Sequence, residues 1–395
     1  MASPPVTYDF FTPPRIVFGW GRRKQLGPIA ADLGRRAFII SGSKTLTASG
    51  ALDELRQSLA AANVAAEMLG TISREPQAVD VDQFTARVCH ERPTDGDFVL
   101  AVGGGSAIDL GKAVAAMATN RASPTVRDYL EGVGSGLKIT SAPLPVLAMP
   151  TTAGTGSEAT KNAVISNQDP PFKKSLRSDM MVPRAVLIDP ELTVSVPPQT
   201  TAYTGMDAIT QLIESYISRR SKLIPNALAL QGIRLAIPTV MVVYREGSLH
   251  FAREMMAHAA LLSGMALANS GLGMAHAVAA ALGVHCGVPH GLACAVMLPA
   301  ALRANRDVAR AGLADLGRTV NDDPPIQDID KAADDFIDQI DVICSELGIP
   351  KRLSEIGVEP RHLPDLVRGS HGNSMSGNPR EISDDELYSI LERML

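Results

Sequence analysis

Four side chains in the second half of the sequence have the types and spacing of a metal site. Asp207 and Gln211 are four residues apart, which places them one turn apart on one face of a helix. His276 and His290 lie in the stretch 255–299, which contains no Asp, Glu, Lys or Arg. Imidazole and carboxylate together suit Zn²⁺ or Fe²⁺. The alternative is that both histidines are hydrogen-bonded core residues, and spacing alone does not decide between the two.

A second group of residues is suited to binding a phosphate. An apolar run at 97–102 leads into a glycine-rich loop that opens a predicted helix. Unpaired N–H groups and the helix dipole favour an anion at such a helix start, and glycines let the backbone approach it closely. The sequence is not the G-x-G-x-x-G fingerprint, because Ile108 stands at the last glycine position, so a plain strand-to-helix turn is the alternative. The candidate residues are Gly103, Gly104, Gly105, Ser106 and Asp109.

The segment 150–158 forms a second candidate loop, with four hydroxyls and two glycines in nine residues. Thr151, Thr152 and Thr155 are suited to donate to a phosphate, a ribose or a carboxamide. The alternative is a helix cap at Thr155 or Ser157. Both loops follow predicted parallel strands, and ligands of open α/β sheets bind at that edge.

The surrounding elements predict an α/β half followed by a helical half. Short apolar runs at 36–41, 97–102, 145–149 and 185–188 indicate buried strands, and 50–62 has helical spacing. We therefore expect a Rossmann-like parallel sheet with helices on both sides in residues 1–195. Long helical patterns dominate from residue 201, so residues 196–395 are predicted to form an all-α domain, with a loop or helix break at 322–325.

Composition excludes several function classes. The 395 residues carry a net charge of −5, which argues against nucleic-acid binding. The four cysteines are scattered and form no CxxC pair, so neither a disulfide framework nor a thiolate zinc site is expected. The N-terminus lacks a secretory signal pattern, and polar and small residues interrupt the charge-free stretch 255–299. We expect buried helices there, no membrane span and a cytoplasmic location, with a membrane-embedded hairpin as the alternative.

Taken together, the motifs resemble the iron-containing (group III) alcohol dehydrogenase family over nearly the whole chain. The matching segments are 16–19, 103–109, 150–158, 188–190, 205–218, 273–299 and 378–380. The resemblance implies a dehydroquinate synthase-like two-domain architecture, with the active site in the cleft between a nucleotide-binding domain and an all-helical domain. It further implies a small alcohol or aldehyde substrate, and a homodimer or larger homo-oligomer.

The resemblance also implies roles for individual residues. The glycines of 103–105 with Ser106 would hold the cofactor pyrophosphate, and Thr151, Thr152 and Thr155 would line the phosphate and nicotinamide site. Lys174 falls where family members have a lysine that contacts the cofactor. Three family metal-ligand positions are matched by Asp207, His276 and His290.

Two positions depart from the family's pattern. The fourth ligand position is usually histidine and is Gln211 here, a neutral and weaker donor, so a harder ion such as Mn²⁺ becomes less improbable. Many members also carry a histidine, assigned to proton relay, where this chain has Ala280. His285, His371 or water are the candidates to replace it.

The cofactor and substrate preferences have weaker signals. The turn after the first long strand contains Gly42 and Ser43, expected cofactor contacts, and Lys44, with no carboxylate to repel a 2′-phosphate. We therefore expect NADP rather than NAD. Lys161 and the adjacent Asn162 are candidate substrate contacts; Lys161 would attract an anionic substrate, or else be solvated or paired with Glu158.

These features predict hydride transfer between the nicotinamide and an alcohol or carbonyl carbon, with a divalent metal polarising the substrate oxygen. Asp207, His276 and His290 would be the catalytic set. The alternatives are a metal-independent reductase like the maleylacetate reductases, a lyase related to dehydroquinate synthase, and a non-catalytic nucleotide-binding protein with a decayed metal site.

Overall fold

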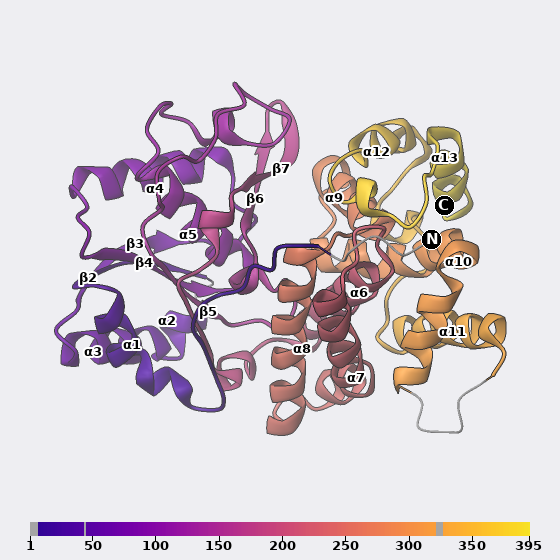
Figure 1. Cartoon of the computed structure of the whole chain (residues 1–395), viewed down its shortest axis with the longest axis horizontal. Helices are drawn as coiled ribbons and strands as arrows, with labels where there is room; N and C mark the ends of the chain where they lie inside the picture. Colours follow the sequence, from indigo (N-terminus) through magenta and orange to yellow (C-terminus); the bar gives the residue numbers. More distant parts are fainter. Residues whose placement is uncertain (1–6, 43–44, 321–326) are drawn as a thin grey trace.

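The computed structural model describes residues 7–42, 45–320 and 327–395. A sheet flanked by helices forms one side of the molecule and a helical bundle the other (Figure 1). This arrangement confirms the predicted α/β half and the helical half that follows it. The loop or break predicted at 322–325 lies outside the described residues.

The central sheet has six strands, all parallel, in the order β1-β8-β5-β4-β2-β3. Its strands are β1 Ile16–Phe18, β2 Arg36–Ser41, β3 Ala65–Thr71, β4 Asp97–Gly103, β5 Val146–Pro150 and β8 Ala185–Ile188. A separate antiparallel hairpin consists of β6 Asn162–Gln168 and β7 Pro171–Arg177. The four predicted strands are therefore present within one residue of their predicted bounds, whereas the short or partly exposed β1, β3 and hairpin strands were not predicted.

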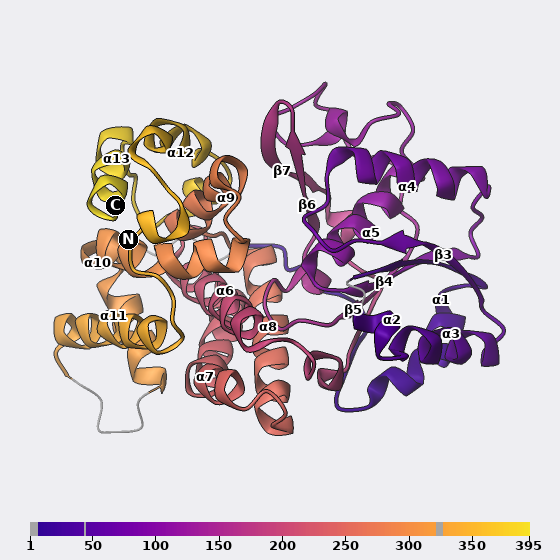
Figure 2. The same cartoon turned by 180° about the vertical axis from the view of Figure 1, so that it is seen from behind.

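Helices cover both faces of the sheet (Figures 1 and 2), and each face has its own apolar core. One face packs on α1 Leu26–Leu33 and α3 Ala51–Ala61, and the other on α4 Ala78–His90 and α5 Gly105–Met117. Strands buried on both faces read as continuous apolar runs rather than alternating ones, which is why the inner strands could be predicted. The short α2 Thr45–Ala48 lies beside α3.

The second half contains eight α-helices among the described residues. They are α6 Pro198–Ile217, α7 Leu223–Arg245, α8 His250–Asn269, α9 Met274–Cys286, α10 His290–Val320, α11 Ile329–Glu346, α12 Leu363–Gly369 and α13 Asp384–Arg393. The charge-free stretch 255–299 thus folds as parts of α8, α9 and α10, as predicted. Of the described helices, α7 alone is long and apolar enough to cross a membrane, and α8 with α9 would pass only as a span bent by 99°. Yet α7 contributes to the main apolar core of the helical half, as a core helix does.

Contacts between distant segments fix the two halves against each other. The N-terminal segment crosses to the end of α8, where Phe11 N–H donates to Asn269 Oδ1 over 2.6 Å and Asn269 Nδ2 donates to the Phe11 carbonyl over 2.7 Å. The loop after β5 meets α8 so closely that a Cβ on Gly156 would lie 2.5 Å from Gly264 Cα. Both halves are therefore in direct backbone contact beside the loops that were predicted to bind a ligand.

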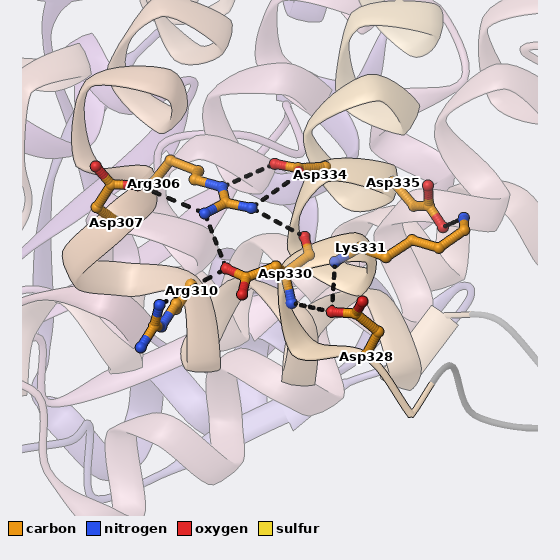
Figure 3. Close-up of polar contacts among 8 residues, drawn as sticks. All are labelled: Arg306, Asp307, Arg310, Asp328, Asp330, Lys331, Asp334 and Asp335. Atoms are coloured by element: carbon orange, nitrogen blue, oxygen red, sulfur yellow. Dashed lines mark hydrogen bonds and ion pairs between the residues drawn. The ribbon is translucent and has the colours of Figure 1, made fainter.

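An ion-pair cluster joins α10 to α11 on the far side of the helical half (Figure 3). Arg306 on α10 donates to both carboxylate oxygens of Asp334 and to Asp330, each over 2.8 Å. Arg310 lies 3.7 Å from Asp330. Because the cluster is largely exposed, we expect it to contribute little to the free energy of unfolding and to act mainly by orienting α11 against α10.

The start of β4 provides a stability test with a defined pH dependence. Asp97 is nearly fully buried and accepts from Arg36 on β2 over 2.7 and 3.0 Å, and from Thr94 N–H over 2.7 Å. Burial alone would raise the pKa of Asp97, but Arg36 and Thr94 outweigh it and hold the pKa below 3.8. Because the folded-state pKa is lowered, this stabilisation is complete above pH about 4 and is lost as the pH falls through the lowered value.

We therefore expect Asp97→Asn to lower the free energy of unfolding by about 1.5–3 kcal/mol at pH 7. The difference from wild type should shrink as the pH falls below about 4. Urea denaturation at pH 7 and pH 3 measures both. The exposed Asp95→Asn is the control and should change stability little. A deficit in Asp97→Asn that stays constant with pH would contradict the assigned ion pair.

Candidate active site

A cleft of about 1760 Å³ lies between the two halves and collects most of the predicted site residues. It is large enough for a dinucleotide and a small second molecule, since drug-sized ligands occupy roughly 300–1,000 Å³. The predicted residues that line it are Gly42, Gly104, Gly105, Ser106, Asp109, Thr151, Thr152, Thr155, Lys161, Asn162, Lys174, Asp207, Gln211, His276, His290 and His371. Gly103 is buried beneath the lining, His285 is absent from it, and Ser43 lies outside the described residues.

The glycine loop joins β4 to α5 in a space that leaves no room for side chains. A Cβ on Gly103, where φ is +158°, would lie 2.7 Å from both Ala107 Cβ and Gly42 Cα. No side chain caps the N-terminus of α5, whose N-cap is Gly104. Ala107 N–H and Ile108 N–H both donate to the Gly104 carbonyl, which leaves the N–H groups of Gly105 and Ser106, two residues that line the cleft, for an anion at the helix start.

Residues 150–158, here called the hydroxyl loop, follow β5 and pack directly on the glycine loop of residues 103–106. A Cβ on Gly105 would lie 2.7 Å from Thr155 Oγ1, and one on Gly104 would lie 3.3 Å from Thr152 Oγ1. The threonine hydroxyls and the uncapped helix start thus face one site from two neighbouring strands. The rule that ligands bind at the carboxyl edge of parallel strands describes this position.

A buried lysine that sequence reasoning missed holds these loops in place. Lys112 on α5 donates to the Ser157 carbonyl and to Thr160 Oγ1, each over 2.8 Å, and pairs with Asp109 at 3.1 Å. Asp109 in turn accepts from Val164 N–H on β6 over 2.9 Å. Burial lowers the pKa of Lys112 and the Asp109 carboxylate opposes that shift. Little in the sequence marks Lys112, because all its partners except Asp109 lie 45 to 50 residues along the chain.

The metal-ligating candidates meet at the helical wall of the cleft. His276 Nε2 lies 3.3 Å from Asp207 Oδ1, and His290 Nε2 lies 3.8 Å from the same oxygen. A fourth donor, the thiol of Cys294, has its sulfur 3.8 Å from His290 Nε2. One atom from each of the four residues lies within 4.8 Å of the others. Bonds of about 2.0–2.3 Å at tetrahedral angles separate neighbouring donors by roughly 3.3–3.8 Å, which matches the three separations of 3.3, 3.8 and 3.8 Å given above. The remaining pairs lie within 4.8 Å, so small shifts would bring all four donors to one ion.

Glu214 orients the central imidazole and was also missed from the sequence. Its carboxylate lies 2.7 Å from His276 Nδ1 and accepts from Ala275 N–H over 2.7 Å. With Nδ1 donating to Glu214, the lone pair of Nε2 points to the cluster, an arrangement that commonly supports histidine ligands. Burial alone would lower the pKa of His276, but Cys294, Asp207 and Glu214 raise it well above 6.5. A proton on His276 therefore occupies the position that a metal ion would take.

The donor set fits a divalent metal ion on two further observations. Asp207 and Glu214 are both nearly fully buried, so their negative charge requires a nearby cation. Burial and the Lys173 ammonium lower the pKa of His290 to about 4, which leaves this imidazole neutral and able to ligate near pH 7. His290 Nδ1 is buried without a hydrogen-bond partner.

Comparison with known proteins identifies the family. The model for iron-containing alcohol dehydrogenases matches residues 13–190, and the model for the C-terminal region of this family matches residues 201–395. The chain belongs to the iron-containing alcohol dehydrogenase family. It is therefore an oxidoreductase that acts on CH–OH groups, and the fold and family expected from the sequence are confirmed.

Individual members of the iron-containing alcohol dehydrogenase family match over nearly their full length. The chain is 32% identical to 1,3-propanediol dehydrogenase of Klebsiella pneumoniae, with 98% of each covered. A crystal structure of a 1,3-propanediol oxidoreductase superposes with a TM-score of 0.91 at 31% identity, over 99% of this chain and 100% of the other. Sulfoacetaldehyde reductase from Bifidobacterium kashiwanohense, solved with NAD⁺, gives a TM-score of 0.87 at 30% identity and 99% coverage of each chain.

Gln211, which stands where the family usually has a histidine ligand, makes hydrogen bonds to neighbouring side chains in this structure. Gln211 lies near Asp207 on α6, but its Oε1 accepts a hydrogen bond from Ser263 Oγ over 2.7 Å. Burial alone would raise the pKa of Asp207, but His290 and His276, with a smaller contribution from Gln211, lower it. Ligation by Gln211 stays a prediction, and in this structure its oxygen contacts the Ser263 hydroxyl.

Of the predicted substrate and proton-relay residues, Lys161, Asn162 and His371 line the cleft and His285 does not. Lys161 pairs with Asp179 over 2.7 Å, and not with Glu158, which was one of the alternatives left open by the sequence. Asn162 lines the cleft beside it. His371 lines the cleft but is half-exposed and lies 2.8 Å from Asp384. His285 lies in the last turn of α9, against α12 and outside the cleft lining.

The Lys112 contacts predict a large loss of stability when they are removed. We expect Lys112→Met to lower the free energy of unfolding by about 3–5 kcal/mol, because the buried Asp109 carboxylate loses its cation. Chemical denaturation measures the change, and the exposed Lys138→Met is the matched control. The double variant Lys112→Met/Asp109→Leu should recover part of the loss. Equal stability of Lys112→Met and Lys138→Met would contradict the assigned role.

Proposed function

We propose that the chain is a nicotinamide-dependent, metal-assisted alcohol dehydrogenase or aldehyde reductase. It would transfer a hydride between the cofactor and a small alcohol or carbonyl compound in the cleft. The main observation in support is that the uncapped start of α5 lines the same cleft as the cluster of Asp207, His276 and His290. The NAD⁺ complex of the related sulfoacetaldehyde reductase supports NAD as a cofactor.

The cofactor would bind along the sheet edge. The N–H groups of the first turn of α5 would hold the pyrophosphate, with Thr151, Thr152 and Thr155 donating to phosphate and ribose oxygens. Lys174 lines the same cleft from β7. The mutual contact of the two loops keeps these donors in place before the cofactor arrives, which lowers the entropy cost of binding.

Asp207, His276 and His290 would hold a divalent metal ion, Fe²⁺ or Zn²⁺, at the helical wall of the cleft. When bound, such an ion acts as a Lewis acid toward an alcohol or carbonyl oxygen. Glu214 keeps the His276 imidazole oriented, and Asp207 supplies the negative charge that balances the ion. The three side chains thereby fix where a substrate oxygen has to lie relative to the nicotinamide.

Reduction of a carbonyl needs one hydride and one proton, and we propose that water in the cleft delivers the proton. Ala280 lines the cleft where the family resemblance implies a histidine, and it has no titratable group. His285 is outside the cleft lining, and His371 is engaged by Asp384. Lys161 is likewise paired, so attraction of an anionic substrate would require its release from Asp179.

We further propose a cytoplasmic enzyme that assembles as a dimer or larger homo-oligomer, without nucleic-acid or membrane partners. The acidic net charge of −5 supports the lack of a nucleic-acid partner, and the packing of α7 in the helical core supports the lack of a membrane partner. The homo-oligomer and the cytoplasmic location are proposed from the family alone.

The first test addresses the metal. We expect His276→Ala and His290→Ala to lose bound metal and about 100-fold or more in kcat/KM, equivalent to roughly 3 kcal/mol. Elemental analysis of protein purified without chelator, together with aldehyde reduction assays, measures both. The exposed His90→Ala is the control. Undiminished turnover without metal would instead favour the metal-independent reductase.

The second test addresses the choice between NAD and NADP. With no carboxylate in the turn 41–44, we expect kcat/KM for NADPH to equal or exceed that for NADH. Ser43→Asp should lower the NADPH-to-NADH ratio by about tenfold, because a carboxylate repels the 2′-phosphate and bonds to the ribose 2′-hydroxyl. Steady-state kinetics with both cofactors measures the ratio. A marked preference of the wild type for NADH would overturn the NADP proposal.

A further inference from the structure

The thiol of Cys294 lies where a fourth metal ligand would be. Cys294 follows His290 by four residues on α10, so both side chains project from one face of the helix. Its sulfur is 3.8 Å from His290 Nε2 and within 4.8 Å of donor atoms of Asp207 and His276. These separations suit a shared ion, and the side chain is fully buried.

The competing fourth ligand is engaged elsewhere. Gln211 Oε1, the only atom of that side chain able to bind a metal well, accepts from Ser263 Oγ over 2.7 Å. Ser263 also lies 2.8 Å from the Ala260 carbonyl within α8, and both Ser263 and Gln211 are buried. Ser263 has one hydroxyl proton, which either Gln211 Oε1 or the Ala260 carbonyl accepts, so the Ser263 contact by itself does not fix the amide. A carboxamide oxygen is a neutral donor, whereas a thiol gains a strong bond to a metal on losing its proton.

Cys294 also has a suitable position relative to the cleft. Asp207, His276 and His290 line the cleft, whereas Cys294 lies behind them. A ligand on the protein side anchors an ion without filling the side from which a substrate oxygen would approach. The donor set would then combine one carboxylate, two imidazoles and one thiolate.

We propose that Cys294, rather than Gln211, is the fourth protein ligand of the active-site metal, and that its thiolate makes the site favour Zn²⁺ over Fe²⁺. The inference rests on the proposed function only in placing a metal at this cluster. Soft thiolate ligands select Zn²⁺, whereas carboxylate, amide and water oxygens suit harder ions such as Mn²⁺. Binding transfers the thiol proton to solvent and forms the sulfur–metal bond, with no change in oxidation state.

The first measurement is metal affinity of the full chain, by competition with a chromophoric chelator. We expect Cys294→Ala to weaken Zn²⁺ binding by more than the roughly 10–100-fold loss typical of removing an outer-shell partner. Gln211→Ala should weaken it by less than about tenfold. Cys344→Ala is the matched control, because it removes a buried thiol from α11 that lies outside the cluster. Equal Zn²⁺ affinity of Cys294→Ala and wild type would overturn the proposal.

The second measurement gives its deciding result on the wild type, and variants serve only to assign the signal. Wild-type protein loaded with Co²⁺ should show the intense near-ultraviolet thiolate-to-Co²⁺ charge-transfer band, which histidine and carboxylate ligands do not produce. Cys294→Ser should abolish the band and Cys344→Ala should keep it. A Co²⁺-loaded wild type without this band would exclude a thiolate ligand even if Cys294 variants failed to fold.

The two proposals fail in different ways. If the wild type binds neither Zn²⁺ nor Co²⁺, the metal assignment fails and the Cys294 proposal fails with it. If the wild type binds the ion tightly and loses it in His276→Ala but not in Cys294→Ala, the metal-assisted function stands and only the Cys294 proposal is overturned. Tighter binding of Fe²⁺ than of Zn²⁺ by the wild type would overturn the stated metal preference.

Discussion

The helical wall of the cleft contains two buried carboxylates whose negative charge has to be compensated, and one imidazole lies between them. Asp207 and Glu214 are both nearly fully buried, and His276 lies between them at 3.3 and 2.7 Å. Burying unpaired carboxylates costs several kcal/mol each, so a positive charge has to be present. A proton on His276 supplies one charge and a divalent ion supplies two. The same arrangement that makes the helical wall costly without a cation is what supports the proposed metal site there.

A metal held at one wall is useful only if the other wall is fixed relative to it. The hydroxyl loop provides this connection, because it touches the glycine loop through Thr155 and the helical half through Gly156. Lys112 ties the base of that loop to α5, and the Phe11–Asn269 pair crosses between the halves nearby. Glycine is required at 105 and 156 because backbone and side chains approach within 3 Å of where a Cβ would be.

How much could be predicted from the sequence depends on the range of the interaction. Inner strands such as β2 and β4 were predictable because burial on both faces gives continuous apolar runs. The two loops and the side chains of Asp207, His276 and His290 line one cleft, as the sequence predicted, and their roles as cofactor and metal contacts stay predictions. Glu214 was not predicted because its contact with His276 spans 62 residues. Lys112 was not predicted because, apart from Asp109 one turn away, its partners lie 45 to 50 residues along the chain. β1 was missed because three residues are too few to show a period.

Cys294 differs from those cases, since a local rule would have found it. The i, i+4 spacing that pairs Asp207 with Gln211 equally pairs His290 with Cys294. The lack of a CxxC pair argues only against a structural zinc site, which usually needs several thiolates. A catalytic zinc site can contain a single thiolate among mixed ligands, so a lone cysteine such as Cys294 remains a candidate. Under the proposal, the ion would have four protein ligands although residue 211 is not a histidine. The fourth ligand would come from α10, behind the cleft, and not from α6.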